Sequence, residues 1–466
     1  MDIDYLFFQL LQVAIGNRNV LSFVPTKEQW TELFLLSKKQ ALIAVAFRGV
    51  KNLYDLSLMG MNVGGLCSSG VMDKKVYLKW LGLTGKIAQR NKMLNEACGE
   101  LVKQYAHDGM LCCILKGQGN LEYYPEGLQD CRTPGDIDVW CKTADSLGID
   151  IAVGDLDGKG AHYEKYHGKQ GVIEYVRMLW RLRRDGSTEL TTSADGDKGK
   201  YEVRYNHVGA PYINGIEVEV HFRPLFLSCP LRNRRLQSWF KDNEQFGMHD
   251  VQVGDNVFPT PTVSFNAVYQ LCHIYRHLFD EGIGLRQLLD YYFVLRALHI
   301  EQGSFADRTQ NMAQWAEGMG VAVRSNEEIM HTLSRFGMKK FAGAVMWVLA
   351  RVFEPNDNGE DDDSLRYDDD DGNDNLCLSD WQKRWPWMIC EPNEKEGKFL
   401  LSEIMQAGNF GKFDNRIKHN GSQFSHAIEK TKHNLRLLTH YPEEVLWEPF
   451  FRVYHWIWRK CELWRY

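Results

Sequence analysis

The sequence predicts an α+β fold, in which a small mixed β-sheet is flanked by N-terminal and C-terminal helical regions. Apolar residues recur every three or four positions through most of the first hundred residues and again from residue 261, which is the period of a helix. Between these regions, short apolar or alternating runs separated by Gly, Pro and Asn indicate strands and turns. The expected regions are an N-terminal helical region (1–108), a core with the sheet (109–245), a helical domain covering a cleft (246–354), an acidic linker or loop (355–376) and a C-terminal helical region (377–466).

Length and charge limit the class of protein. A chain of 466 residues with 44% hydrophobic and 25% charged residues is long enough for two or three folded domains. The net charge of -6 comes from residues 357–374, which hold ten acids and one Arg, so the remainder is slightly basic. This stretch lacks the spacing of a calcium loop and is expected to be a solvated linker. There is no long Lys/Arg run, which argues against nucleic acid as a partner.

The sequence also favours a soluble, cytoplasmic protein. The N-terminus carries acids where a signal peptide has positive charge, and no apolar run reaches the roughly 18 residues of a membrane span. The eleven cysteines show no zinc-type spacing, and most lie in apolar segments, as reduced core thiols do. We therefore expect no membrane contact.

Individual elements follow from local patterns. The run LCCIL is a short strand ended by Lys116 and Gly117, and GDIDVWC is a second strand. The alternating runs YEVRYNH and IEVEVHF predict two further strands, with a hairpin turn at Asn214-Gly215. The aromatic C-terminal end is expected to be core or docking surface. Helices are expected at 6–13, 27–50, 75–107, 171–184, 263–279, 285–299, 326–353 and 425–438, and a surface loop at 186–200.

The run RTPGDIDVW, residues 132–140, places two carboxylates one residue apart. On a strand, the side chains of Asp136 and Asp138 leave the same face, roughly 7 Å apart along the chain. Like charges this close repel unless a cation neutralises them, which favours a magnesium site. For an isolated Asp-x-Asp, the alternative is a pair of acids at a solvent-facing sheet edge.

A third carboxylate, Glu219, lies on the later strand IEVEVHF, on the face opposite its apolar residues. Three carboxylates on adjacent strands are what two-metal phosphoryl chemistry requires. Lys116, Gly117 and Gln118 end the preceding strand and could offer an ammonium and backbone N–H groups to phosphates. The set predicts a nucleotide site with two magnesium ions, Mn²⁺ being an alternative.

Other polar residues are less specific candidates for the site. Glu217 and His221 share the face of Glu219, and a polar network is favoured for both over a direct role. Arg132 and Arg223 flank the acidic strands, where either could offset carboxylate repulsion or reach a phosphate. The pairs His273/His277 and Arg286/Asp290 have i,i+4 spacing. For the histidines, we favour a pair whose hydrogen bonds are satisfied within the protein over a metal site. For Arg286 and Asp290, we favour an ion pair that stabilises its helix or caps the cleft.

The succession ILKG, RTPGDIDVW and VEVHFRP resembles the nucleotidyltransferase superfamily with the DNA polymerase beta-like fold, and most closely its uncharacterised bacterial branch. The later segments HLFDEGIGLRQLLDYY, GNFGK and YPEE are also similar to that branch. The resemblance implies that Asp136 and Asp138 are the metal-binding pair, Glu219 the third carboxylate and Gly117 the glycine of the phosphate turn. The superfamily usually has Ser where this chain has Gln118. This departure concerns the part of the site that would bind the triphosphate, not the metal ligands.

The expected activity is transfer of a nucleoside monophosphate from a nucleoside triphosphate, such as ATP, to a hydroxyl of an unidentified small molecule or protein. A metal-dependent glycosyltransferase is an alternative, because an Asp-x-Asp motif also holds the manganese of a nucleotide sugar. A catalytically inactive nucleotide- or partner-binding protein on the same scaffold is a third interpretation.

Overall fold

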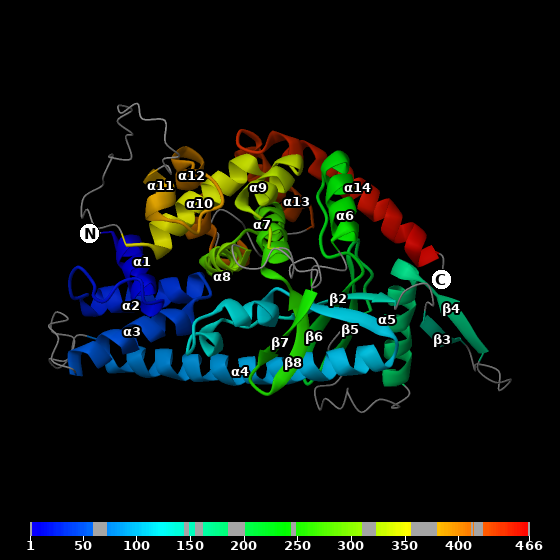
Figure 1. Ribbon diagram of the computed structural model, residues 1–466, viewed down its shortest axis with the longest axis horizontal. Coiled ribbons are helices and arrows are strands. Elements are labelled where there is room, and N and C mark those ends of the chain that lie inside the picture. The colour runs from blue at the N-terminus through cyan, green and yellow to red at the C-terminus, as the bar shows by residue number, and fades with distance from the viewer. Residues whose placement is uncertain are drawn as a thin grey trace. The chain divides into compact units, whose positions relative to one another are not determined.

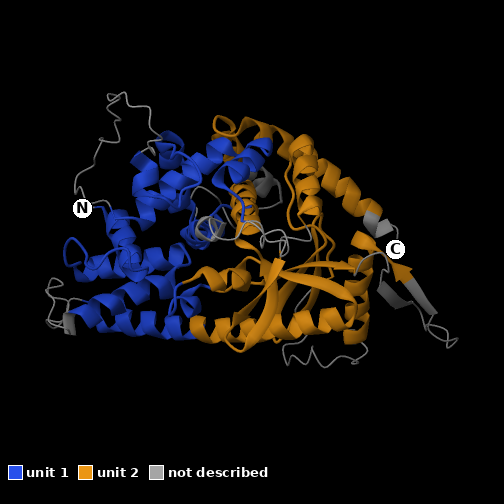
Figure 2. Cartoon of the chain, in the orientation of Figure 1, with its two compact units in different colours: residues 1–86, 125–133, 280–417 blue, residues 87–124, 134–279, 418–466 orange. Residues whose placement is uncertain are grey.

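The protein is represented by a computed structural model that describes residues 2–58, 72–143, 149–153, 162–184, 201–243, 248–309, 323–355, 380–411, 413 and 423–464. The chain forms two compact units, each discontinuous in sequence (Figure 2). Unit 1 comprises residues 1–86, 125–133 and 280–417, and unit 2 comprises residues 87–124, 134–279 and 418–466. The five regions expected from the sequence remain a prediction. No helix in the described ranges is long and apolar enough to span a bilayer.

Unit 1 is helical. Its central helix is α1 (Ile3–Ala14), most of whose side chains are buried and which packs against α3 and α10. The other elements are α2 (Lys27–Lys39), α3 (Ile43–Leu58), the start of α4 (Lys74–His107), η2 (Gln129–Cys131), α8 (Leu285–Thr309), α9 (Asn326–Arg335), α10 (Lys339–Phe353), α11 (Asp380–Arg384), α12 (Glu394–Ala407) and η5 (Asn409–Gly411).

Two of the expected helices are each divided in two, so their predicted continuity was wrong. Residues 27–50 form α2 and the start of α3, and the break lies at Ala41, whose φ is 55°. Residues 326–353 form α9 and α10, separated at Gly337, whose φ is 75°. A left-handed residue ends a helix, and an apolar period of three to four continues across such a short break.

Unit 2 contains the predicted mixed sheet, which confirms the α+β class (Figure 1). The strand order is β1-β2-β6-β5; β2 and β6 are parallel, and both outer pairs are antiparallel. The strands are β1 (Met110–Leu115), β2 (Ile137–Thr143), β5 (His207–Ile213) and β6 (Ile216–His221), with two hairpins, β3 (Ile149–Val153) with β4 (His162–Tyr166) and β7 (Met248–Val253) with β8 (Asn256–Pro261). The remaining elements are most of α4, η1 (Gly117–Tyr123), α5 (Gly168–Arg184), α6 (Pro230–Asp242), α7 (Val263–Asp280), α13 (Gln423–Leu438) and α14 (Pro442–Trp464).

The hairpin prediction was right about the turn and wrong about the first strand. Asn214 and Gly215 both have positive φ, 51° and 72°, as a tight two-residue hairpin turn requires. The strand before them is His207–Ile213, whereas YEVRYNH contributes only an isolated bridge at Val203 and the first residue of β5. The expected loop at 186–200 and the acidic stretch 357–374 lie outside the described residues.

The two faces of the central strands have different environments. Val139 of β2 and Val218 and Val220 of β6 join a buried apolar core with residues of α4 and α5, which lie along this side of the sheet (Figure 1). Because side chains alternate along a strand, Asp138 and Glu219 leave the opposite face. The apolar core therefore fixes the direction in which the carboxylates point.

The C-terminal aromatic residues divide between two faces of α14. Phe451 and Trp458 pack around Tyr205, with ring centroids 5.2 and 5.6 Å from it. Phe450 and Trp456 are 67% and 62% exposed. The core-or-docking interpretation is therefore confirmed for the packed face.

Candidate active site on the mixed sheet

Three carboxylates meet on the polar face of the sheet. In the parallel pairing of β2 with β6, Asp138 lies directly opposite Glu219. One ligand oxygen of each of Asp136, Asp138 and Glu219 falls within 4.8 Å of the others. Asp136 comes just before β2, where its side chain is exposed. The structure thus brings together the three residues that the sequence singled out as metal ligands.

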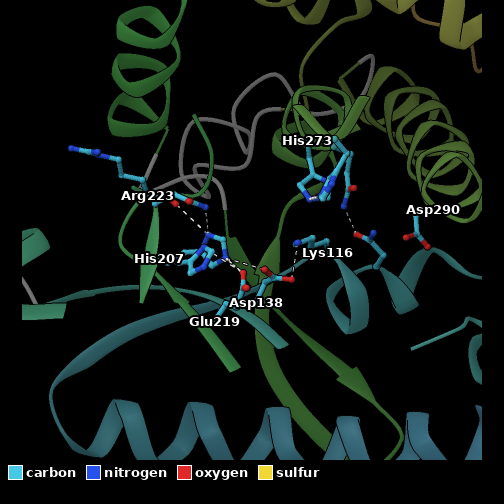
Figure 3. Close-up of polar contacts among 12 residues, drawn as sticks. Lys116, Asp138, His207, Glu219, Arg223, His273 and Asp290 are labelled. Atoms are coloured by element: carbon cyan, nitrogen blue, oxygen red, sulfur yellow. Dashed lines mark hydrogen bonds and ion pairs between the residues drawn. The ribbon is translucent and has the colours of Figure 1, made fainter. Parts of the chain in front are cut away.

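Asp138 is buried, and each of its carboxylate oxygens contacts a cationic side chain (Figure 3). Oδ1 accepts a hydrogen bond from Nε2 of His221 at 2.9 Å, and Oδ2 pairs with Nζ of Lys116 at 2.9 Å. Burial alone would raise the pKa of Asp138, but the Lys116 ammonium and the His221 hydrogen bond together hold it well below its usual range. Asp138 is therefore an ionised carboxylate in a buried position.

His221 has the role in a polar network that the sequence favoured. Its Nδ1 donates a hydrogen bond to the Arg223 carbonyl oxygen at 3.3 Å, which fixes the ring. Burial disfavours the imidazolium, but the hydrogen bonds to Asp138 and then Glu219 outweigh it and raise the pKa of His221 to about 9. The protonated ring donates to the carboxylate and holds it in place.

His207 is a member of the cluster that the sequence analysis missed. It lies directly opposite His221 in the β5–β6 pairing, and its Nδ1 is 3.3 Å from Oε2 of Glu219. Burial, followed by the charge of His221, lowers the pKa of His207 to about 3, so this ring is neutral. Counting back from the Asn214-Gly215 turn could have found it, but a bulge in β5 shifts the register between Ala210 and Ile213.

The segment after β1 has an unusual backbone. Lys116 has φ 41° and ψ −158°, and Gly117 has φ 49°. The Gln118 side chain is buried and donates to Oδ1 of Asn95 at 2.6 Å, so it is held against α4. Asn120 accepts from Asn266 and Gln270 of α7 at 2.9 Å each. Contacts of Gly117 and Gln118 with phosphate remain a prediction, in which Gln118 would act through its backbone.

The remaining candidates lie elsewhere. Arg223 donates to the Tyr205 carbonyl oxygen at 3.2 Å and stacks on that ring, away from the carboxylates (Figure 3). Glu217 is exposed at the start of β6. Arg132 belongs to unit 1, where it forms a buried bidentate pair with Asp290, both distances being 2.8 Å. A phosphate contact for Arg132 or Arg223, and a place for Glu217 in a polar network, remain predictions.

The histidine pair on α7 is joined by a hydrogen bond. Nε2 of His273 and Nε2 of His277 are 3.0 Å apart. Burial, followed by the charge of Lys116, keeps the pKa of His273 well below its usual value, so this ring is neutral. The contact is consistent with the satisfied-histidine interpretation.

The donor set suits a hard divalent cation. Carboxylate oxygens are the ligands that Mg²⁺ and Mn²⁺ take in proteins. The charge of Asp138 raises the pKa of Asp136 to about 6, as expected where two carboxylates lie close together. The described residues hold a second group of potential ligands, His207, Glu219 and His221, which shares Glu219 with the first. Mg²⁺ fits the carboxylate group.

A mixed sheet that gathers three carboxylates beside a lysine could hold a divalent cation, an arrangement typical of enzymes that act on phosphate esters. The sequence model of a family described as uncharacterised nucleotidyltransferase matches residues 26–316, more than half of the chain. The chain therefore belongs to this family, and nucleotidyl transfer is its supported general activity. The match includes every residue of the site. No curated protein and no solved structure matches the chain.

Proposed function

We propose that the protein transfers a nucleoside monophosphate from a nucleoside triphosphate to a hydroxyl acceptor, using two Mg²⁺ ions held by Asp136, Asp138 and Glu219. The observation that carries the proposal is the strand register, in which Asp138 lies opposite Glu219. A carboxylate oxygen of Asp136 lies within 4.8 Å of a carboxylate oxygen of each of these residues. Membership of the nucleotidyltransferase family supports it. We also propose that the domain belongs to the DNA polymerase beta-like superfamily and acts in the cytoplasm of a bacterium.

Each residue has a proposed task. Bound magnesium would neutralise the charge that develops on the α-phosphate and lower the pKa of the acceptor hydroxyl. Asp136, Asp138 and Glu219 are the residues that would hold the cations. His221 holds the Asp138 carboxylate in orientation through its 2.9 Å hydrogen bond. Lys116, Gly117 and Gln118 lie at the end of β1, where they contact the phosphates.

The proposal is tested by calorimetric titration of the protein with each of the four ribonucleoside triphosphates and with a nucleotide sugar, with and without Mg²⁺. We expect binding of at least one triphosphate that requires Mg²⁺ and is lost in Asp136→Ala/Asp138→Ala. The matched control is Glu217→Ala, which removes an exposed carboxylate two positions from Glu219 on the same strand face. This variant should bind as the wild type does.

Transfer itself is measured with triphosphates labelled at the α-phosphate, by following label in acceptor pools and release of pyrophosphate. Preference for the nucleotide sugar would favour the glycosyltransferase alternative. Magnesium-dependent binding with no transfer to any acceptor would favour the nucleotide-binding scaffold. Absence of binding under every condition would overturn the proposal.

A further inference from the structure

Lys116 is held in a conformation that lysine rarely adopts. Its φ of 41° with ψ −158° lies outside the regions open to most L-residues, so the backbone is strained there. Its carbonyl oxygen accepts from the Gly119 amide at 2.7 Å, which fixes the turn. The side chain is 20% exposed and ends on Oδ2 of Asp138. The strained backbone thus accompanies a specific placement of the ammonium.

The charges of the site are unevenly matched. Among the residues that the structure describes, the three carboxylates are accompanied by two cationic side chains, Lys116 and His221, and both of these contact Asp138. The Lys116 ammonium lies 2.9 Å from Oδ2 of Asp138. It therefore compensates part of the negative charge at the position where divalent cations are proposed to bind.

The two cationic contacts of Asp138 differ in mobility. The His221 ring is 5% exposed and is fixed at its other nitrogen, whereas Lys116 has a flexible four-carbon stem and a partly exposed head. Since both oxygens of Asp138 are occupied, a cation bound by this carboxylate must share or replace one contact. The Lys116 contact is the one that can be released without moving the strands.

We infer that Lys116 is an exchangeable counter-ion of the metal site. It neutralises Asp138 in the protein without bound cations, and it moves to the triphosphate when divalent cations take that oxygen. This inference rests on the proposed function. The exchange breaks one ion pair and forms another, with no covalent step. Before substrate arrives, the ammonium lowers the affinity of the site for divalent cations; afterwards it contributes to nucleotide binding.

The inference predicts effects of opposite sign from one substitution. Lys116→Met keeps the length of the side chain and removes its charge. In nucleotide-free, chelator-treated protein, Mn²⁺ should bind at least about tenfold more tightly to Lys116→Met than to the wild type, because like charges a few ångströms apart repel strongly in a partly buried site. At saturating Mg²⁺, the same variant should bind a non-hydrolysable triphosphate analogue about tenfold less tightly.

Mn²⁺ binding is measured by the loss of the free-ion electron paramagnetic resonance signal, which needs no catalysis. Lys142→Met removes a lysine from the same strand as Asp138, roughly 13 Å further along, and should change neither affinity. Lys116→Arg keeps the charge and should bind Mn²⁺ much as the wild type does. Asp138→Asn should abolish Mn²⁺ binding. Circular dichroism checks that each variant folds, and Lys116→Gln replaces Lys116→Met if that variant does not.

The outcomes separate the inference from the proposed function. If Lys116→Met binds Mn²⁺ no more tightly than the wild type, the counter-ion role is wrong, while the nucleotidyltransferase proposal stands. If both affinities fall together, Lys116 is a structural anchor of the turn. If neither the wild type nor any variant binds Mn²⁺, the metal site itself is wrong, and the proposed function fails with it.

Discussion

Replacing Arg132 by Met should destabilise unit 1 by about 3–5 kcal/mol, which is the usual cost of leaving one partner of a buried ion pair alone. Arg132 and Asp290 are 5% and 3% exposed, and two guanidinium nitrogens donate to the two oxygens of Asp290 at 2.8 Å. The pair joins the segment 125–133 to helix α8 within unit 1. Without the guanidinium, Asp290 loses its bidentate partner in a buried position.

Differential scanning calorimetry measures the effect. For a unit of roughly 230 residues, a loss of this size lowers the melting temperature by about 6–20 °C. Lys398→Met, which removes an exposed i,i+4 pair with Glu394 in the same unit, should shift it by less than about 2 °C. Arg132→Met/Asp290→Leu should recover much of the loss, because neither charge of the pair is then buried without the other. If Arg132→Met has the melting temperature of the wild type but binds nucleotide poorly, this reasoning is refuted. That result would favour the phosphate contact that the sequence suggested for Arg132.

Three further predictions concern unit 2. Phe451→Ala should cost about 2–4 kcal/mol in urea unfolding because its ring packs in the Tyr205 cluster, whereas the adjacent Phe450→Ala, 67% exposed in the wild type, should change it by less than about 0.5 kcal/mol. Burial, and then the charge of Arg459, lower the pKa of His455. Because the folded state disfavours the imidazolium, the free energy of unfolding should fall as pH drops below about 6.5. His455→Phe should reduce this dependence of the free energy of unfolding on pH. Glu219→Gln should weaken Mn²⁺ binding at least about tenfold in the resonance assay, while Glu217→Gln should leave it unchanged; equal losses would contradict the assigned ligand set.

Local patterns were enough to predict the sheet strands that carry the acids. LCCIL and GDIDVWC are short, β-branched or apolar, and bounded by Gly and Pro, and they form β1 and β2. Alternation in IEVEVHF predicted β6 and the face on which Glu219 lies. These predictions hold because the apolar side of each strand must enter the core, which leaves the acids on the other side.

Breaks in regular structure were less visible. Ala41 takes a left-handed conformation between α2 and α3 without a Gly or Pro to indicate it. The strand before the hairpin begins at His207 because tertiary pairing with β6, not the alternation of YEVRYNH, decides where pairing starts. His207 was missed because a bulge in β5 shifts the register between Ala210 and Ile213.

The pairing of Asp138 with Glu219 could be suspected from the sequence but not located, because 81 residues separate them and strand order is not a local property. The sequence also could not show how a buried carboxylate is tolerated. An Asp-x-Asp motif is common, and burial of one unpaired carboxylate is strongly unfavourable. Lys116, which follows β1, and His221 of β6 reduce that cost by contacting the two oxygens of Asp138. In the proposed metal site the three acids are therefore accompanied by two cationic side chains, Lys116 and His221. Their substitution should therefore change metal affinity even though neither residue is a proposed ligand.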